Sequence, residues 1–221
     1  MLDQATNEML TRIGPNTPCG DLMRRYWHPL GFSSELNEAR QTKKVRLLGE
    51  DLILARTEEG KLLLVQERCP HRGASLLYGF VEGESIRCAY HGWRYNRAGE
   101  CVERPFESEK ANRACKKLIQ SYATEECGGL IFAYLGPEVD KPAFPNWDIL
   151  TRNDGVRHFE TQDDLACNWL QVQENAVDVT HTFYTHSKYF EHLGIADNSG
   201  FNKPFKRFGF QRFDWGIVKS W

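Results

Sequence analysis

The sequence predicts an α+β protein in which a small antiparallel β domain is followed by the beginning of a second, α+β domain. Short runs rich in Leu, Ile and Val occupy residues 44–66 and 121–135 and alternate with Gly-containing turns, a pattern typical of antiparallel strands. A helical pattern without Gly or Pro follows at residues 167–186. Three prolines within 136–146 mark a linker between the two parts.

The first element is a short helical segment, residues 1–27. Apolar residues recur on one face of a helix over residues 3–13, and Gly14-Pro15 ends it. An extended segment should begin at His28. No other potential metal ligand lies close to His28 in the sequence, so a structural role is favoured over metal binding.

The next elements are short strands. Residues 45–48, 52–55 and 62–65 are apolar runs separated by turns, and residues 121–125 and 128–135 read as closing strands. We therefore expect the first domain to span residues 28–140. Residues 141–221 would hold the linker and an incomplete N-terminal part of the second domain, where residues 157–163 are expected to form a strand.

The most informative motif joins two Cys-to-His steps. Cys69 and His71 form C-x-H, Cys88 and His91 form C-x2-H, and sixteen residues separate the two steps. Two thiolates and two imidazoles can hold a [2Fe–2S] cluster, with the thiolates on one iron and the imidazoles on the other. Neutral imidazoles remove negative charge, so such a cluster accepts an electron more readily than an all-Cys cluster.

These four residues admit two other interpretations. Structural zinc sites usually separate their first ligand pair by two to four residues, and C-x-H is tighter than that. Alternatively, the two cysteines could be small buried hydrophobic residues, with the two histidines incidental. The spacing favours the iron–sulfur cluster over both alternatives.

The flanking residues carry a family resemblance. The two loops read Cys69-Pro-His-Arg-Gly-Ala-Ser-Leu and Cys88-Ala-Tyr-His-Gly-Trp-Arg-Tyr95, and they resemble the Rieske domain of the aromatic ring-hydroxylating oxygenases. The segment Gly14–Trp27 is similar to the phthalate 4,5-dioxygenase branch of that family. High-potential Rieske proteins carry one more Cys in each loop. This chain has none at those positions, which favours an oxygenase-type or ferredoxin-type cluster.

A second motif lies in the later helical pattern. Asp178, His181 and His186 form D-x2-H-x4-H. On a regular helix, residues five apart point about 140° away from each other. The helix must therefore bulge between the two histidines if both are to bind one metal, and a π-bulge would do this. Two imidazoles and one carboxylate form the facial triad of non-haem Fe(II) oxygen activation.

The resemblance assigns roles to this motif. It implies that the chain is an alpha (oxygenase) subunit in which His181 and His186 bind a mononuclear iron. Asp178 would bridge that iron site to a cluster ligand in electron transfer. The third ligand in the family is an Asp from a later strand, and Asp197 and Asp214 follow the motif too soon to match it. We therefore expect that this ligand lies beyond residue 221 and that the chain is truncated within a helix-grip-like catalytic domain.

The resemblance also implies an activity and partners. The chain would belong to the oxygenase component of a multicomponent enzyme that uses O2 and electrons from a separate NADH-dependent reductase. It would mono- or dihydroxylate an aromatic substrate, expected to be carboxylated, and would assemble as a homotrimer or higher multiple. The alternatives are an aromatic O-demethylase of the same family, a stand-alone Rieske electron carrier, or a zinc-stabilised scaffold protein.

Composition restricts the partners and the cellular compartment that we expect for this protein. The formal net charge is -2, so nothing indicates nucleic acid or an anionic membrane surface as a partner. No apolar run is long enough for a transmembrane helix, and no secretory signal is visible. The cysteines outside the cluster motif show no disulfide framework, and we expect reduced thiols in a bacterial cytoplasm. These cysteines are Cys19, Cys101, Cys115, Cys127 and Cys167.

Overall fold

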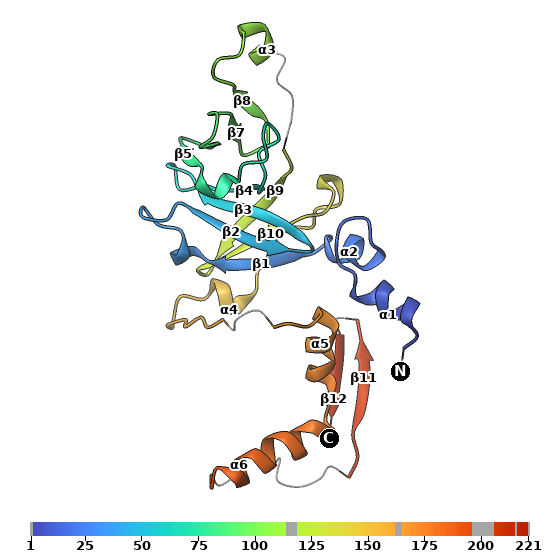
Figure 1. Ribbon diagram of the computed structural model, residues 1–221. Coiled ribbons are helices and arrows are strands. Elements are labelled where there is room, and N and C mark those ends of the chain that lie inside the picture. Colours follow the sequence, from blue (N-terminus) through green and yellow to red (C-terminus); the bar gives the residue numbers. More distant parts are fainter. Residues whose placement is uncertain (1, 114–118, 162–164, 196–205, 215, 221) are drawn as a thin grey trace. The chain divides into compact units, whose positions relative to one another are not determined.

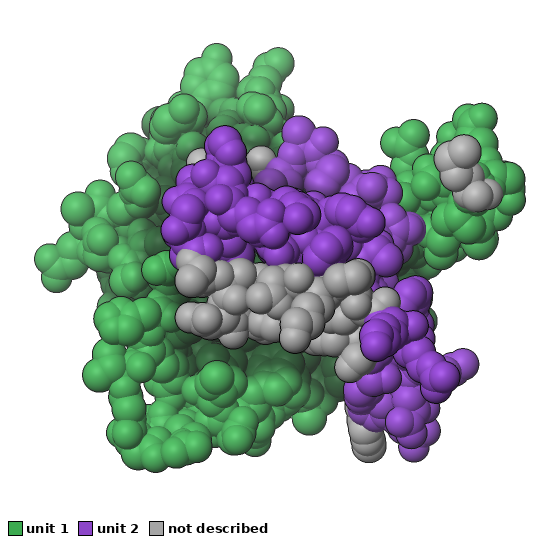
Figure 2. Space-filling model, turned by 90° about the horizontal axis from the view of Figure 1, so that it is seen from below, with its two compact units in different colours: residues 1–161 green, residues 162–221 purple. Residues whose placement is uncertain are grey.

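The computed structural model divides the chain into two compact units, residues 1–161 and 162–221 (Figure 2). The residues that the structure describes are 2–113, 119–161, 165–195, 206–214 and 216–220. Cys115 and Asp197 therefore lie outside the described residues. The domain boundary predicted at 140/141 falls inside the first unit.

Two helices precede the first sheet, and the first of them lies within the helix predicted over residues 3–13. Helix α1 (Gln4–Thr11) begins where the Asp3 carboxylate accepts a hydrogen bond from the Thr6 amide at 2.9 Å. Helix α2 (Pro18–Met23) begins at Thr17, whose hydroxyl oxygen accepts from the Gly20 amide at 3.2 Å.

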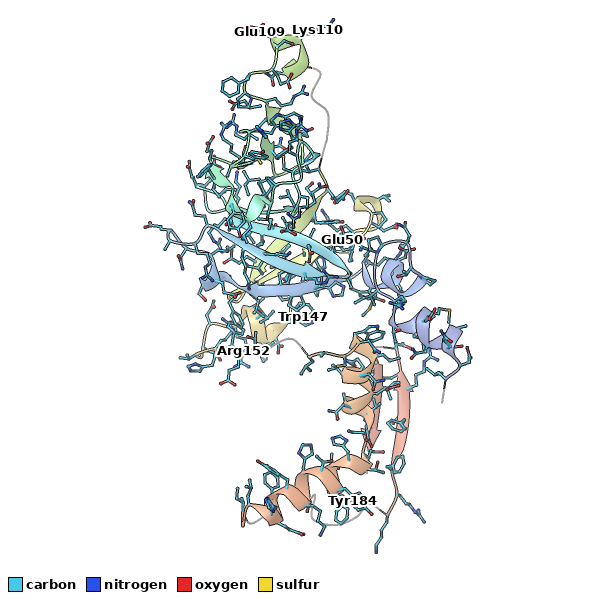
Figure 3. The ribbon with its side chains drawn as sticks, viewed as in Figure 1. Glu50, Glu109, Lys110, Trp147, Arg152 and Tyr184 are labelled. Carbon is cyan, nitrogen blue, oxygen red and sulfur yellow. The ribbon has the colours of Figure 1, made fainter. Side chains whose placement is uncertain are left out.

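An ion pair fixes α2 against the first sheet. The guanidinium of Arg24, just after α2, donates to Glu50 at 2.5 Å, and the Tyr122 hydroxyl donates to the same carboxylate at 2.7 Å. Figure 3 labels Glu50 at the sheet. Nearby, the His28 ring lies 2.7 Å from the Met23 carbonyl, which agrees with the structural role predicted for His28.

The first unit is built on a six-stranded sheet whose neighbouring strands are all antiparallel (Figure 1). Its order is β1-β10-β9-β4-β3-β2. The strands are β1 (Trp27–Phe32), β2 (Thr42–Leu47), β3 (Glu50–Arg56), β4 (Leu62–Gln66), β9 (Ser121–Cys127) and β10 (Leu130–Tyr134). A short 3-10 helix, η1 (Ser33–Glu35), follows β1.

Strands β3 and β4 of this sheet are buried on both faces. In β3, Leu52 and Leu54 pack into one apolar core, whereas Ile53 and Ala55 pack into another. Successive side chains of a strand point to opposite faces, so each strand serves two cores. This explains why β3 and β4 read as continuous apolar runs in the sequence and not as alternating ones.

One of these two cores is shared with a second, four-stranded antiparallel sheet of order β5-β6-β7-β8. Its strands are β5 (Phe80–Glu82), β6 (Ser85–Arg87), β7 (Arg94–Asn96) and β8 (Cys101–Glu103), and η2 (Leu76–Tyr78) and α3 (Glu109–Arg113) flank it. Loop 1, residues 67–75, leads from β4 to η2. Loop 2, residues 88–93, joins β6 to β7. Loop 2 therefore lies within the small sheet, and loop 1 leads from the large sheet towards it.

Residues 136–151, which include the linker predicted within 136–146, pack on the large sheet. The Phe144 ring lies 5.4 Å from Trp27 and 5.1 Å from Phe132 between ring centroids, and Trp147, labelled in Figure 3, lies 5.6 Å from Phe132. The segment includes η3 (Glu138–Asp140) and α4 (Asp148–Thr151). The strand predicted at 157–163 is wrong over 157–161, which has no regular structure. Contacts between aromatic rings, including Phe159 stacked on Phe32 with centroids 5.4 Å apart, hold residues 144–159 in place of strand pairing.

The second unit begins with α5 (Trp169–Val177), whose N-terminus is capped by Asn168. A π-helical turn, η4 (Thr182–Ser187), and α6 (Lys188–His192) follow. Strands β11 (Gly209–Phe213) and β12 (Gly216–Ser220) form a hairpin. No helix within the described ranges has the length and apolar composition needed to cross a membrane.

The helix predicted over 167–186 is only partly correct. It is interrupted at residues 178–179, where Asp178 adopts an extended conformation at the end of α5. The bulge expected between the two histidines is confirmed, because η4 is a π-helical turn.

Candidate metal centres

Loop 1 bends back on its own cysteine. The Cys69 amide donates to the Ala74 carbonyl at 2.9 Å, and the Gly73 amide donates to the Cys69 carbonyl at 2.9 Å. Gly73 has φ of 71°, a conformation that glycine adopts without the steric cost of a Cβ atom. The loop therefore closes within five residues of its cysteine.

Loop 2 repeats the same hydrogen bonds. The Cys88 amide donates to the Trp93 carbonyl at 2.8 Å, and the Gly92 amide donates to the Cys88 carbonyl at 3.0 Å. Gly92 has φ of 73°. The two loops thus share one backbone arrangement, although the histidine is two residues after the cysteine in loop 1 and three residues after it in loop 2.

The fold brings the predicted residues into two pairs. Cys69 and Cys88 are buried in the same apolar core. The rings of His71 and His91 lie 4.5 Å apart between centroids. His91 is exposed and His71 is half-buried, so the imidazole pair lies nearer the surface than the thiol pair.

The chemistry of these groups fits a [2Fe–2S] cluster. Burial raises the pKa of the Cys69 thiol, so a cation is needed to hold it as a thiolate at neutral pH. The buried Nδ1 of His71 has no hydrogen-bond partner among the described residues. In that part of the chain, no three Cys, His, Asp or Glu side chains converge on a single ion. The arrangement is one thiol pair and one imidazole pair, which is the donor set of a Rieske cluster.

Two aromatic side chains complete the surroundings of this site. The Trp93 ring stacks on His71, with centroids 4.6 Å apart and planes 4° from parallel. The Tyr95 hydroxyl lies 3.2 Å from Cys69 Sγ. Burial raises the pKa of Tyr95, so the phenol keeps its proton. Neither contact could be read from the sequence, because no spacing rule links these positions.

We expect Tyr95→Phe to lower the reduction potential of the bound cluster. A metal-bound thiolate has no proton, so Tyr95 must donate in this hydrogen bond, and a donor to sulfur favours the more negative, reduced cluster. One hydrogen bond of about 1–1.5 kcal/mol corresponds to roughly 40–60 mV for one electron. A redox titration measures this, with Tyr122→Phe as control because the Tyr122 hydroxyl binds Glu50 instead. An unchanged potential in Tyr95→Phe would contradict the prediction.

The second candidate site lies around η4. Asp178 accepts hydrogen bonds from the amide and the hydroxyl of Thr180, both at 2.8 Å. These bonds lower the pKa of Asp178. Its other carboxylate oxygen lies 3.2 Å from His181 Nδ1, a buried atom that has no aligned hydrogen bond in the described structure.

The π-helical turn brings the two histidines of this motif together. The rings of His181 and His186 lie 5.3 Å apart between centroids. Two imidazoles and a nearby carboxylate suit a non-haem iron. Among the described residues these groups do not close into a three-ligand site, and Asp214 lies in the β11–β12 turn.

A comparison with family models identifies the Rieske [2Fe-2S] domain at residues 26–123. This range contains both loops and most of the first unit.

Three curated relatives match beyond that domain. The 5,5'-dehydrodivanillate O-demethylase oxygenase subunit of Sphingobium sp. is 38% identical over 99% of this chain and 51% of its own length. The tert-butanol monooxygenase / tert-amyl alcohol desaturase oxygenase subunit of Aquincola tertiaricarbonis is 40% identical over 82% of this chain and 38% of its own length. The phthalate 4,5-dioxygenase oxygenase subunit of Pseudomonas putida is 37% identical over 86% and 43%.

A solved structure agrees with these relatives. The complex between oxygenase and ferredoxin in carbazole 1,9a-dioxygenase matches with a TM-score of 0.59 and 27% identity, covering 82% of this chain and 47% of that one. The chain thus spans about half the length of the relatives it matches.

Proposed function

The chain belongs to the Rieske oxygenase alpha subunits, and from this membership we propose that it forms part of the oxygenase component of a multicomponent Rieske oxygenase. The observation that supports this most is the presence of two separate candidate centres in one chain. The first unit holds the Cys and His pairs of loops 1 and 2, and the second unit holds the two histidines around η4.

At the first centre, Cys69, His71, Cys88 and His91 would hold the cluster. The two thiols are buried, whereas the two imidazoles lie near the surface. The half-buried His71 ring is held by its stack on Trp93. When bound, the cluster supplies one-electron transfer. The exposed His91 would place the electron-transfer face at the surface of the unit.

At the second centre, His181 and His186 would bind the mononuclear iron, which supplies O2 activation when bound. Asp178 contacts His181 through one oxygen and is held by Thr180 through the other. This orientation suits a bridging carboxylate between the iron site and a cluster ligand. We propose that Asp178 acts in electron transfer.

The partners follow from this assignment. Electrons would come from a separate reductase that uses NADH, directly or through a ferredoxin, and the protein would work as a homotrimer or higher multiple in a bacterial cytoplasm. Among the described residues, Cys19, Cys127 and Cys167 are free thiols, which suits a reducing compartment.

The substrate proposed is an aromatic molecule, carboxylated as in the phthalate-type resemblance, with mono- or dihydroxylation as the reaction. Aromatic O-demethylation is the alternative within the family, and the 38% identical relative named for demethylation favours testing it. The relative named for tert-butanol shows that membership alone does not restrict substrates to aromatic rings. Aromatic acids, aromatic methyl ethers and tertiary alcohols should therefore be screened together for substrate-dependent O2 uptake.

The deciding experiment is electron paramagnetic resonance of the dithionite-reduced protein, with iron counted on the same sample. A Rieske-type signal with more than two irons per chain supports both centres. A Rieske signal with two irons favours the electron-carrier alternative for this chain. The iron count is then repeated on a longer chain, as long as the relatives that this chain matches. A colourless protein containing zinc would overturn the proposal.

A further inference from the structure

Loops 1 and 2 resemble each other in one side-chain contact as well as in their backbone arrangement. At both loops the residue before the cysteine is an arginine, Arg68 within loop 1 and Arg87 at the end of β6, and the residue four positions after the cysteine is a glycine. Arg68 Nη1 donates to the Gly73 carbonyl at 3.2 Å, and Arg87 Nη1 donates to the Gly92 carbonyl at 2.7 Å. An arginine therefore closes each loop from the same position.

The two arginines are held very differently. Arg87 donates from Nε and Nη2 to the two oxygens of Glu82, both at 2.7 Å, and from Nη2 to Glu103 at 2.9 Å. Its side chain is 19% exposed. The Arg68 side chain is 65% exposed, and its ion pair with Glu67 is 3.7 Å long. A guanidinium that donates to both oxygens of one carboxylate is fixed in orientation as well as paired with an opposite charge. Of these two arginines, only Arg87 is held in this way.

The surroundings of the two glycines differ in the same way. A Cβ atom on Gly92 would lie 3.0 Å from Pro105 Cγ and 3.8 Å from Arg87 Nη1, whereas a Cβ on Gly73 would meet nothing within 4 Å. Loop 2 is therefore packed between Arg87 and Pro105. Glu82 ends β5 and Glu103 ends β8, so the frame that holds Arg87 is the small sheet itself.

We propose that Arg87 is a positioning residue for loop 2, which holds the Gly92 carbonyl, and with it the neighbouring His91, in a frame set by β5 and β8. This inference rests on the proposed assignment of Cys88 and His91 to the cluster. Hydrogen bonds to the sulfurs and solvent exposure set the potential of an iron–sulfur cluster, and both depend on where the loop lies. Loosening loop 2 should therefore weaken those hydrogen bonds and make the cluster harder to reduce.

Three variants of the cluster-loaded protein, purified without air, test this role. Arg87→Lys keeps a positive charge beside Glu82 and Glu103, but one ammonium group cannot form a two-oxygen fork and also reach Gly92. Arg87→Gln removes both the charge and the fork. Arg68→Gln is the matched control, because it removes the equivalent contact from loop 1.

The readouts are the midpoint potential and the line shape of the reduced paramagnetic signal, which a merely structural role would leave unchanged in protein that retains its iron. We expect both Arg87 variants to broaden the signal and to lower the equilibrium constant for reduction at least tenfold, which is 59 mV for one electron. Arg68→Gln should stay within twofold of wild type.

Wild-type potential and line shape in Arg87→Lys would overturn the positioning role and leave only an effect of charge. An equal shift in Arg68→Gln would also overturn it. Should Arg87→Gln not fold, Arg87→Lys and Arg68→Gln decide the question. A wild-type protein without a Rieske-type signal would overturn the cluster assignment and this inference together, whereas a normal wild-type signal with unaltered Arg87 variants would overturn the positioning role alone.

Discussion

Replacing His91 by alanine is expected to abolish the Rieske-type paramagnetic signal and to lower the iron content of the first centre to near zero. His91 is exposed, and exposed substitutions away from special features usually change stability by no more than about 0.5 kcal/mol. A cluster that loses one of two imidazole ligands cannot keep the same coordination. The expected loss is therefore one of metal binding, with the fold retained.

The measurement is iron content and the reduced signal on protein whose folding is checked by circular dichroism. His158→Ala is the matched control, because His158 is also an exposed histidine of the first unit and lies outside both loops. It should keep wild-type iron and signal. A normal Rieske signal in His91→Ala would show that His91 is not a ligand.

Replacing Asp178 by asparagine is expected to slow electron transfer to the mononuclear site by about a hundredfold or more while both metals remain bound. Asparagine has nearly the same shape, and its amide oxygen can still accept from Thr180. It loses the negative charge beside His181 Nδ1. Because the Thr180 hydrogen bonds lower the pKa of Asp178, the wild-type carboxylate stays charged through neutral pH, and this charge is lost only in acid.

Single-turnover oxidation of the reduced cluster measures this rate. It is followed optically in a chain as long as the relatives that this chain matches. Glu191→Gln is the matched control in the same unit, since Glu191 is an exposed carboxylate on α6 that pairs with Lys188. It should oxidise at the wild-type rate. A wild-type rate in Asp178→Asn, with iron content unchanged, would remove Asp178 from the electron-transfer route.

Much of the first candidate site could be predicted from sequence because its donors lie in two short stretches. Cys69 with His71 and Cys88 with His91 are close along the chain, and Gly73 and Gly92 mark the bends that close each loop. What could not be predicted is which other side chains reach these loops. Trp93 was visible as part of the motif, but its stack on His71 depends on how the two loops meet.

At the second site, too, one feature could be predicted from the sequence and another could not. The five-residue separation of His181 and His186 required a local departure from a regular helix, and η4 provides it. The break at 178–179 was missed, because apolar periodicity continues through it. Asp178 instead bonds to Thr180, and short polar side chains that bond to nearby backbone compete with helix formation.

By itself, the sequence determined the order of the parts, the apolar runs that become β3 and β4, and the spacing of both ligand motifs. These features are local, since they depend on residues within one or two turns or strands of each other. Only the tertiary structure decided that residues 141–161 pack on the large sheet through Phe144 and Trp147, and that Arg87 is held by Glu82 and Glu103. Contacts of this kind join separate elements, and their partners are selected by the burial of apolar area and by the pairing of charges once the strands have assembled.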